Sequence, residues 1–418
     1  MGPKSEKSQR GRVLAITSVV VGLLLACLGD AASGSPGNGS PSLLGMPTAN
    51  QAPTASPNTT KQGTTPATLR VTPANLAVDV PPNAPVTVEA SSGTLRVITL
   101  VDAKGNKVDG QISADGSWAI DELLRPSTAY TLAIAAIGPD GLSTSTTSTF
   151  RTLTPTISAT YSLLPDGGTV GVGMPVIVQF DTAVDTKARR VEVEKRVNIT
   201  TVPDQMGSWG WLDDRQLMWR PQSYWLPGTK VTVSTPLHGV QTGDKKWITG
   251  DQATSFTVGP SMVSSVDMQA HSMTVRRNGA LIRTFPVSTG KPGPQTETRS
   301  GIKVIISRDP VIVMDSATIG IPKGSPGYYK ITTNWDLRLT WTGEFIHSAP
   351  WSVGAQGNTN VSHGCTNMAP ADALWMYNNS RVGDVVTFKG SSRVFRPEEG
   401  IGVWVYDYAG WKARSALA

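Results

Sequence analysis

Three residues close together in the sequence could form a reactive thiol centre. His347, His363 and Cys365 all lie between Gly343 and Met368. A thiol at its ordinary pKa of about 8.5 is mostly protonated at neutral pH, and a nearby imidazole both lowers that pKa and accepts the proton. Gly364 leaves the main chain open to a substrate carbonyl. The spacing therefore predicts a Cys–His nucleophile pair, with an oxyanion hole formed by backbone N–H groups at Gly364 and Cys365.

The neighbouring segments must bring these side chains together. Phe345 and Ile346 have the apolar character of a strand end that would carry His347 to a sheet edge. A loop rich in Gly, Asn and Ser follows. If residues 362–367 are extended, the side-chain period of two places His363 and Cys365 on one face.

Two other interpretations of these residues stay open at this point. A buried structural cysteine is commoner than a catalytic one. A zinc site is also conceivable, because His347, His363 and Cys365 could supply three ligands. However, the chain has no CxxC pair, no HExxH motif and no obvious fourth ligand, and we expect no metal.

The complete string around the thiol, HSAPWSVGAQGNTNVSHGC followed by Thr366 and Asn367, resembles the signature of the L,D-transpeptidases. These are bacterial cell-wall enzymes with a YkuD-type catalytic domain, and the string is similar to their mycobacterial branch. The resemblance implies Cys365 as nucleophile, His347 as general base, the main-chain carbonyl of Ser348 as the group that orients the base, and His363 beside the thiol. It covers the last third of the chain strongly and the domains before it more loosely. Thr366 departs from the family pattern, where an apolar residue is more usual.

A loop before His347 is expected to bind substrate. Residues 315–330 (DSATIGIPKGSPGYYK) are rich in Gly and Pro, and long loops of this kind are commonly lids or binding loops. In the related enzymes this region closes over the thiol, and the resemblance matches Tyr329 and Met314 to family positions, with Tyr328 as the alternative tyrosine. Ordinary surface packing is the other interpretation of both tyrosines. The substrate-binding residues expected by resemblance are Met314, Tyr328, Tyr329, Trp351 and Asn367.

The resemblance also implies a reaction on peptidoglycan. The Cys365 thiolate would attack the stem-peptide carbonyl before the terminal D-Ala, and an amine of a neighbouring stem would resolve the thioester. The donor would be a tetrapeptide stem with meso-diaminopimelate at position three, the product a 3→3 cross-link, the inhibitors carbapenem-type β-lactams, and no cofactor would be needed. The alternatives are an L,D-carboxypeptidase, an enzyme that attaches protein to the wall, or a non-catalytic wall-spacing lipoprotein.

The N-terminal residues predict export and lipid anchoring. Residues 1–12 are basic, and an apolar run from Val13 to Ala26 follows, which together have the form of a secretory signal over residues 1–26. Leu24-Leu-Ala-Cys27 resembles a bacterial lipobox, which implies that Cys27 is acylated. An uncleaved anchor is the alternative. Both place the body in the cell envelope, at the outer face of the cytoplasmic membrane (the periplasmic space). With Cys27 lipidated, Cys365 has no cysteine partner, which in an exported protein suggests a reactive thiol.

Composition and charge limit the other possibilities. Residues 27–67 are mostly Gly, Ser, Pro, Asn, Thr and Ala, so this segment cannot bury enough apolar surface to fold and is expected to be a flexible linker. Half of the formal net charge of +6 lies in residues 1–12. No basic stripe or nucleic-acid motif is present in the sequence, and we expect no nucleic-acid partner.

The central part of the chain predicts two immunoglobulin-like β-sandwiches, at 68–153 and 154–259. Short alternating strands are separated by turn residues such as Asp115-Gly116. The two units echo each other, since LRPSTAYTL from Leu124 resembles WLPGTKVTV from Trp225. The second unit contains the tryptophans 209, 211, 219 and 225. They could bind carbohydrate, but filling the core and the contact with the next domain is favoured because the rings are large.

A mostly β catalytic domain is expected at 260–390, followed by a tail at 391–418 that the resemblance packs against it. An Asn278-Gly279 turn predicts a hairpin. Strands are expected at 303–307, 311–314 and 385–388, with one convincing helix from Pro370 to Asn379. The predicted fold is therefore mostly β, with two sandwiches ahead of a YkuD-type domain that has one main helix.

Overall fold

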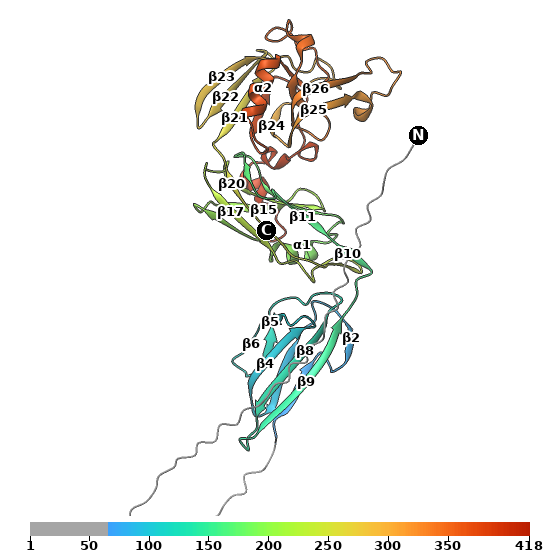
Figure 1. Ribbon diagram of the computed structural model, residues 1–418, viewed down its shortest axis with the longest axis vertical. Coiled ribbons are helices and arrows are strands. Elements are labelled where there is room, and N and C mark those ends of the chain that lie inside the picture. Colours follow the sequence, from blue (N-terminus) through green and yellow to red (C-terminus); the bar gives the residue numbers. More distant parts are fainter. Residues whose placement is uncertain (1–65) are drawn as a thin grey trace, which may run out of the picture. The chain divides into compact units, whose positions relative to one another are not determined.

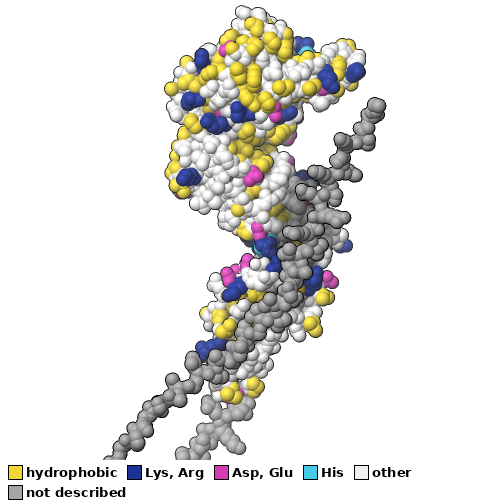
Figure 2. Space-filling view, viewed as in Figure 1, with side chains coloured by type: hydrophobic (Ala, Val, Ile, Leu, Met, Phe, Trp, Pro, Cys, Tyr) yellow, Lys and Arg dark blue, Asp and Glu magenta, His cyan; other side chains and the backbone are white. Residues whose placement is uncertain are grey.

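The computed structural model describes residues 66–418, and the predicted signal, Cys27 and nearly all of the predicted linker lie outside the described residues. The described part is mostly β (Figure 1), as the sequence predicts, and Figure 2 shows the same view with the side chains coloured by type. None of its helices has the length and apolar character needed to cross a membrane.

The first sandwich consists of two sheets whose strands alternate between buried and exposed residues. β8 shows this most clearly, because every second residue from Tyr130 to Ala136 is buried, the pattern of a sheet with one face on the core. One sheet has the order β1-β3-β7-β6 and the other β2-β9-β8-β4-β5. Their bounds are β1 Thr68–Thr72, β2 Ala77–Val80, β3 Thr87–Ser92, β4 Thr94–Asp102, β5 Lys107–Val108, β6 Gly110–Ile112, β7 Trp118–Ile120, β8 Ala129–Ile137 and β9 Ser143–Thr152.

The second sandwich has sheets in the orders β11-β13-β16-β15 and β12-β20-β17-β14, with a small sheet β10-β19-β18. Its strands are β10 Ile157–Ala159, β11 Tyr161–Leu164, β12 Thr169–Val170, β13 Val176–Phe180, β14 Asn198–Val202, β15 Gly207–Trp211, β16 Gln216–Pro221, β17 Lys230–Thr235, β18 Gln241–Gly243, β19 Lys246–Ile248 and β20 Gln252–Val258. It also contains helix α1 (Lys187–Glu194), which the sequence analysis missed. The side chain of Thr186 caps α1 by accepting from Arg189 N–H.

The sequence echo between the two sandwiches corresponds to equivalent strands. β8 pairs antiparallel with β9, which also pairs in parallel with β2. β17 and β20 repeat this arrangement, with β12 as the parallel neighbour. The strands that pair with β8 and β17 each carry a buried phenylalanine, Phe150 in β9 and Phe256 in β20.

The tryptophan cluster belongs to the core of the second sandwich. Trp211, Trp219 and Trp225 are buried, and Trp219 stacks on Trp225 with ring centroids 5.1 Å apart. The same apolar cluster includes Val304 and Val385 of the following domain and Trp411 of the tail. These three rings fill the core and the domain contact, as the sequence analysis favoured, and Trp209 is partly buried against the same cluster.

The catalytic domain is built on two sheets. One has the order β23-β22-β21-β29-β24, and the other, β25-β26-β27-β28, carries the site. Their bounds are β21 Met262–Asp267, β22 Ser272–Arg277, β23 Ala280–Pro286, β24 Gly301–Val304, β25 Ser307–Asp315, β26 Lys330–Arg338, β27 Phe345–Ser348, β28 Thr366–Met368 and β29 Val385–Lys389. The predicted strand at 303–307 is wrong, because β24 ends at Val304 and β25 begins at Ser307, where the chain moves to the other sheet.

Two local predictions for this domain are confirmed. Helix α2 runs from Pro370 to Asn379, with Pro at its first position, where the missing N–H costs nothing. Asn278 and Gly279 both have positive φ, at 49° and 84°, the conformation required by a type I′ hairpin turn between β22 and β23.

The tail contacts both the catalytic domain and the second sandwich. Ser300 N–H donates to Arg393 O in the catalytic domain. Trp404 Nε1–H then donates to Gly173 O, and Trp411 Nε1–H donates to Ser208 O, both in the second sandwich. The contact with the sandwich was not predicted. The tail contains η3 (Pro397–Glu399), η4 (Gly402–Val405) and α3 (Tyr408–Lys412).

Candidate active site

Cys365 lies at a cavity of about 310 Å³ in the catalytic domain. The parallel pairing of β27 with β28 forms its base, since His347 is in register with Asn367, two residues after Cys365. The pairing therefore brings the imidazole and the thiol to one end of the sheet. The cavity is lined by Met314, Tyr329, Ile331, His347, Trp351, Val361, Ser362, His363, Cys365 and Asn367.

His347 is held in one orientation by its neighbour. Its Nδ1 lies 2.9 Å from the main-chain oxygen of Ser348. A carbonyl only accepts, so Nδ1 carries the proton and Nε2 is left as the acceptor. Burial lowers the pKa of His347 to about 4, although the bond to Ser348 opposes this shift. The imidazole is therefore neutral at neutral pH and able to accept a proton.

The thiol of Cys365 is buried and uncharged. It packs among Met314, Phe345 and the partly buried Tyr329, and its Sγ–H donates to Gly343 O at 3.5 Å. Burial raises the pKa of Cys365 to about 12, and the backbone N–H of Phe345 only partly offsets this. The prediction that the thiol pKa is lowered is wrong, because the apolar surroundings disfavour the thiolate more than a neutral imidazole can favour it.

Residues 362–365 are not extended, so strand periodicity does not place His363 and Cys365 on one face, as the sequence analysis assumed. Gly364 has φ 132°, and the chain bends at 363–364. Gly364 N–H donates to Ser362 Oγ at 3.1 Å, so it is already satisfied and does not point freely at a substrate. Among residues 66–418 we find no acceptor for the Cys365 N–H. That group is the better oxyanion donor of the two that the sequence suggested.

The loop between β25 and β26 provides one wall of the cavity. Met314 is in β25, and Tyr329 directly precedes β26, after a short 3₁₀ turn η1 (Ser316–Ile319). Two bonds close the neck of the loop, from Ser316 N–H to Tyr329 O and from Tyr329 N–H to Ser316 Oγ. Of the two tyrosines, Tyr329 lines the cavity and Tyr328 does not.

The other expected residues also reach the cavity. The His363 ring lies 5.2 Å from the ring of Tyr329, and burial lowers its pKa. Trp351, in η2 (Pro350–Ser352), is 57% exposed at the cavity and lies 6.0 Å from the His347 ring. Asn367 is buried, and its amide donates to Ser352 Oγ at 3.0 Å.

Comparison with known proteins identifies the family. Residues 77–241 match the bacterial Ig domain family, and residues 262–388 match the L,D-transpeptidase catalytic domain family, YkuD. The chain is 39% identical over 345 residues to L,D-transpeptidase 2 of Mycobacterium tuberculosis, covering 82% of this chain and 83% of the relative. The chain belongs to the L,D-transpeptidase family.

One further relative is similar over a comparable length, and a solved structure is similar over a shorter one. L,D-transpeptidase 5 of Mycobacterium tuberculosis is 35% identical over 358 residues, which cover 84% of this chain and 77% of that protein. The solved structure of the L,D-transpeptidase LdtMt1 in complex with imipenem is 37% identical, with a TM-score of 0.48, over 56% of this chain and 100% of that one.

Three residues of this L,D-transpeptidase line the cavity without having been predicted to do so: Ile331, Val361 and Ser362. Ser362 was within reach of sequence reasoning, because it belongs to the SHGC string. Ile331 and Val361 carry no chemical signal. Among the described residues, no cluster of three or more His, Cys, Asp or Glu side chains could hold a metal ion.

Proposed function

We propose that this L,D-transpeptidase acts through a thioester on Cys365. His347 Nε2 removes the thiol proton as Sγ attacks the carbonyl of the stem residue before the terminal D-Ala. The C–N bond to D-Ala then breaks, and the leaving amine takes the proton from His347. An amine of a neighbouring stem attacks the thioester, passes its proton to His347, and frees the Cys365 thiol as the 3→3 cross-link forms.

One observation carries this proposal: His347 is fixed with Nε2 as acceptor in the same cavity as a buried thiol. Both groups are uncharged at neutral pH, since burial raises the pKa of Cys365 to about 12 and lowers that of His347 to about 4. A standing thiolate–imidazolium pair is therefore disfavoured. Proton transfer is coupled to the arrival of the substrate, after Sγ–H turns from Gly343 O toward the imidazole.

The Cys365 N–H would hold the oxygen of the tetrahedral intermediate. It lies next to the nucleophile and has no acceptor among residues 66–418. A main-chain donor fixed before reaction stabilises developing negative charge strongly, and one such donor is typically worth on the order of 10²–10³ in rate.

Mass spectrometry with a disaccharide-tetrapeptide tests the proposed reaction. We expect release of D-Ala, a mass increase on the peptide containing Cys365, and a cross-linked dimer. If the only product with excess acceptor stem is the tripeptide, the enzyme is a carboxypeptidase and the transferase step of the proposal is wrong.

We also propose that carbapenem-type β-lactams acylate Cys365. The relative LdtMt1 was solved in complex with imipenem, and the chain belongs to the same family. Attack of Sγ on the lactam carbonyl would open the ring and leave a thioester in the cavity. The intact mass of the protein after incubation with imipenem reports this adduct.

Tyr329 is expected to keep water from the thioester. Its ring is half buried over the cavity, and a transferase must exclude water while it positions the acceptor amine. Tyr329→Ala should lower the dimer-to-tripeptide ratio by at least about threefold, because the opened cavity admits water. Tyr328→Ala, the adjacent change outside the cavity, serves as the control and should leave the ratio unchanged. Equal ratios for the two variants would exclude this role.

We propose that the protein is anchored at the outer face of the cytoplasmic membrane through lipid on Cys27. The support is the basic and apolar N-terminal pattern that ends in Leu-Leu-Ala-Cys. The N-terminal peptide of the protein from its native membrane should begin with a diacylated Cys27. Cys27→Ala should abolish that processing, and an intact Met1 in the mature protein would instead support an uncleaved anchor.

A further inference from the structure

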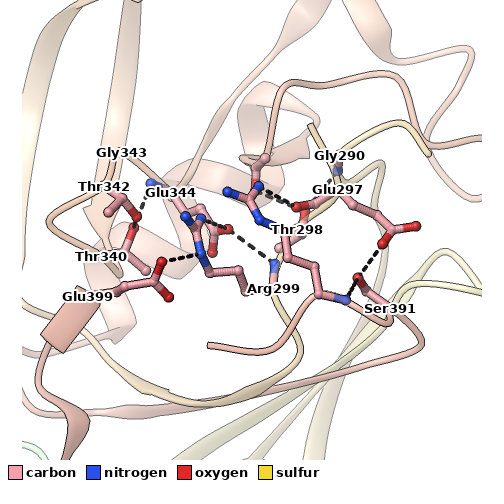
Figure 3. A network of polar contacts seen from close by, with 12 residues as sticks. Gly290, Glu297, Thr298, Arg299, Thr340, Thr342, Gly343, Glu344, Ser391 and Glu399 are labelled. Carbon is pink, nitrogen blue, oxygen red and sulfur yellow. Dashed lines mark hydrogen bonds and ion pairs between the residues drawn. The ribbon is translucent and has the colours of Figure 1, made fainter. Parts of the chain in front are cut away.

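Near the thiol lies a cluster of four charged side chains, three of them buried and one partly buried, that the reaction above does not use. The carboxylate of Glu344 pairs with Arg299 Nη1 at 2.8 Å and also with Lys303 Nζ. Arg299 Nε pairs in turn with Glu399 of the tail at 2.8 Å, and Figure 3 shows Arg299 between the two carboxylates. Lys303 is fully buried and Glu344 is 3% exposed. The two positive and two negative charges balance, as buried charges require.

Glu344 adjoins the nucleophile through its own main chain. The main-chain oxygen of the preceding residue, Gly343, accepts the hydrogen bond from the Cys365 thiol. Glu344 N–H donates to Thr340 Oγ1 at 2.9 Å, which fixes this turn (Figure 3). A Cβ placed on Gly364 would lie 3.5 Å from Glu344 Cγ, so the side chain also packs against the residue before the thiol.

The Glu344 carboxylate is also connected to the nucleophile through hydrogen bonds of Arg299 and Thr298. Glu344 Oε1 accepts from Arg299 N–H at 3.1 Å. The preceding residue, Thr298, donates from Oγ1 to Gly364 O at 2.9 Å. Because a peptide unit is planar, fixing Gly364 O also fixes the direction of the Cys365 N–H, the oxyanion donor proposed above.

We propose that Glu344, held by Arg299 and Lys303 and through Arg299 by Glu399, is a positioning residue for the Cys365 thiol and its N–H. The inference rests on the proposed function, since it assigns these two groups their roles. It also gives the tail a part in catalysis: Glu399 connects the tail to the nucleophile through Arg299 and Glu344.

The charges of the cluster also act on the thiol. Glu344 and Asp336 raise the pKa of Cys365, and Lys303 lowers it, within a shift dominated by burial. His347, His363 and Tyr329 face the same cavity. Removing the Lys303 charge would leave Glu344 paired with Arg299 alone and would disfavour the thiolate, because Lys303 lowers the pKa of Cys365. Removing the Glu344 charge would favour the thiolate while loosening the geometry.

A matched pair of substitutions in η3 tests the connection to the tail. Glu399→Gln removes one charge from the cluster, and Glu398→Gln makes the same change one residue away, on an exposed side chain. We expect Glu399→Gln to lower kcat for D-Ala release about threefold or more with KM unchanged, because a buried charge pair is broken. Glu398→Gln should match the unmodified protein, and equal kcat for the two variants would overturn the link to the tail.

Glu344→Gln and Lys303→Met test the positioning role itself. Glu344→Gln should lower kcat at least about tenfold. It should nevertheless speed the alkylation of Cys365 by iodoacetamide at fixed pH. The alkylation is measured on the peptide that contains Cys365, so that Cys27 is not counted. Lys303→Met should slow alkylation, and the double variant should return it toward the unmodified rate. A purely structural role would expose the thiol and speed alkylation in both single variants, so opposite shifts for Glu344→Gln and Lys303→Met distinguish the positioning role from a loosened fold.

These outcomes separate two failures. If the unmodified protein releases no D-Ala, or releases it without Cys365, the proposed function is wrong. If release depends on Cys365 but Glu344→Gln changes neither kcat nor alkylation, only the positioning role is wrong. Should Glu344→Gln fail to fold, Lys303→Met and Glu399→Gln decide by the same measurements.

Discussion

Cys365→Ala is expected to abolish D-Ala release, with a loss on the order of 10⁵ or more, because removal of a covalent nucleophile leaves only binding and oxyanion stabilisation. The fold should survive. The side chain is small, it packs with Met314 and Phe345, and Ala leaves only a small void in an apolar site. The measurement is the initial rate of D-Ala release from the disaccharide-tetrapeptide, with circular dichroism as the check on folding.

Two further readouts make this result specific. The Cys365→Ala protein should show no mass increase after incubation with donor stem or with imipenem, while Cys27→Ala should be acylated like the unmodified protein. D-Ala release near the unmodified rate by a folded Cys365→Ala protein would falsify the thioester mechanism.

His347→Gln should reduce the rate of acylation by about 10²–10⁴, the range that a positioned general base contributes. The pair acts as a unit, so this loss should not add fully to that of Cys365→Ala. The pH profile supplies a second readout. Since burial lowers the pKa of His347 to about 4, the base is unprotonated above that pH, and the rate should stay level from about pH 5 to 8 and fall only as the pH approaches 4.

The other imidazole at the cavity is the control. His363→Gln should cost less than about tenfold. Its ring packs against Tyr329, and among residues 66–418 no main-chain carbonyl fixes its acceptor nitrogen. Equal losses for His347→Gln and His363→Gln would mean that the assignment of the base to His347 is unsupported.

The sequence was informative where one short segment contains both the reactive residues and the strands that position them. His347, Cys365 and Ser348 lie close together in the chain, and a single parallel strand pair, β27 with β28, arranges them. Helix α2 could be predicted to its end residues because Pro370 begins it and good helix formers follow. The sandwich strands were recognisable from their period of two.

The properties that were missed depend on residues distant in the chain. The thiol pKa is raised because Met314 and Tyr329 cover Cys365, which no local pattern indicates. Lys303 and Glu344 are 41 residues apart, and each alone has the appearance of an ordinary surface charge. Helix α1 was missed because its sequence, KARRVEVE, has β-branched residues and no apolar stripe.

The sequence also could not indicate that the tail shares the core of the second sandwich. Trp411 is fully buried there, and Arg220 donates to the main-chain oxygens of Tyr406 and Asp407. Aromatic residues in a tail signal burial without identifying the surface that covers them.

The uncharged state of the resting thiol has a consequence for chemical durability. Hydrogen peroxide and related oxidants react with the thiolate, and sulfinic and sulfonic products are irreversible for most enzymes. At the outer face of the membrane proposed above, the glutathione and thioredoxin that keep cytosolic thiols reduced are absent. Because burial raises the pKa of Cys365 to about 12, almost none of it is thiolate at neutral pH, and small oxidants find little to attack. In the mechanism proposed above, the thiol loses its proton only to His347, when a substrate carbonyl is already in the cavity. The burial that keeps the thiol protonated would then also slow its oxidation.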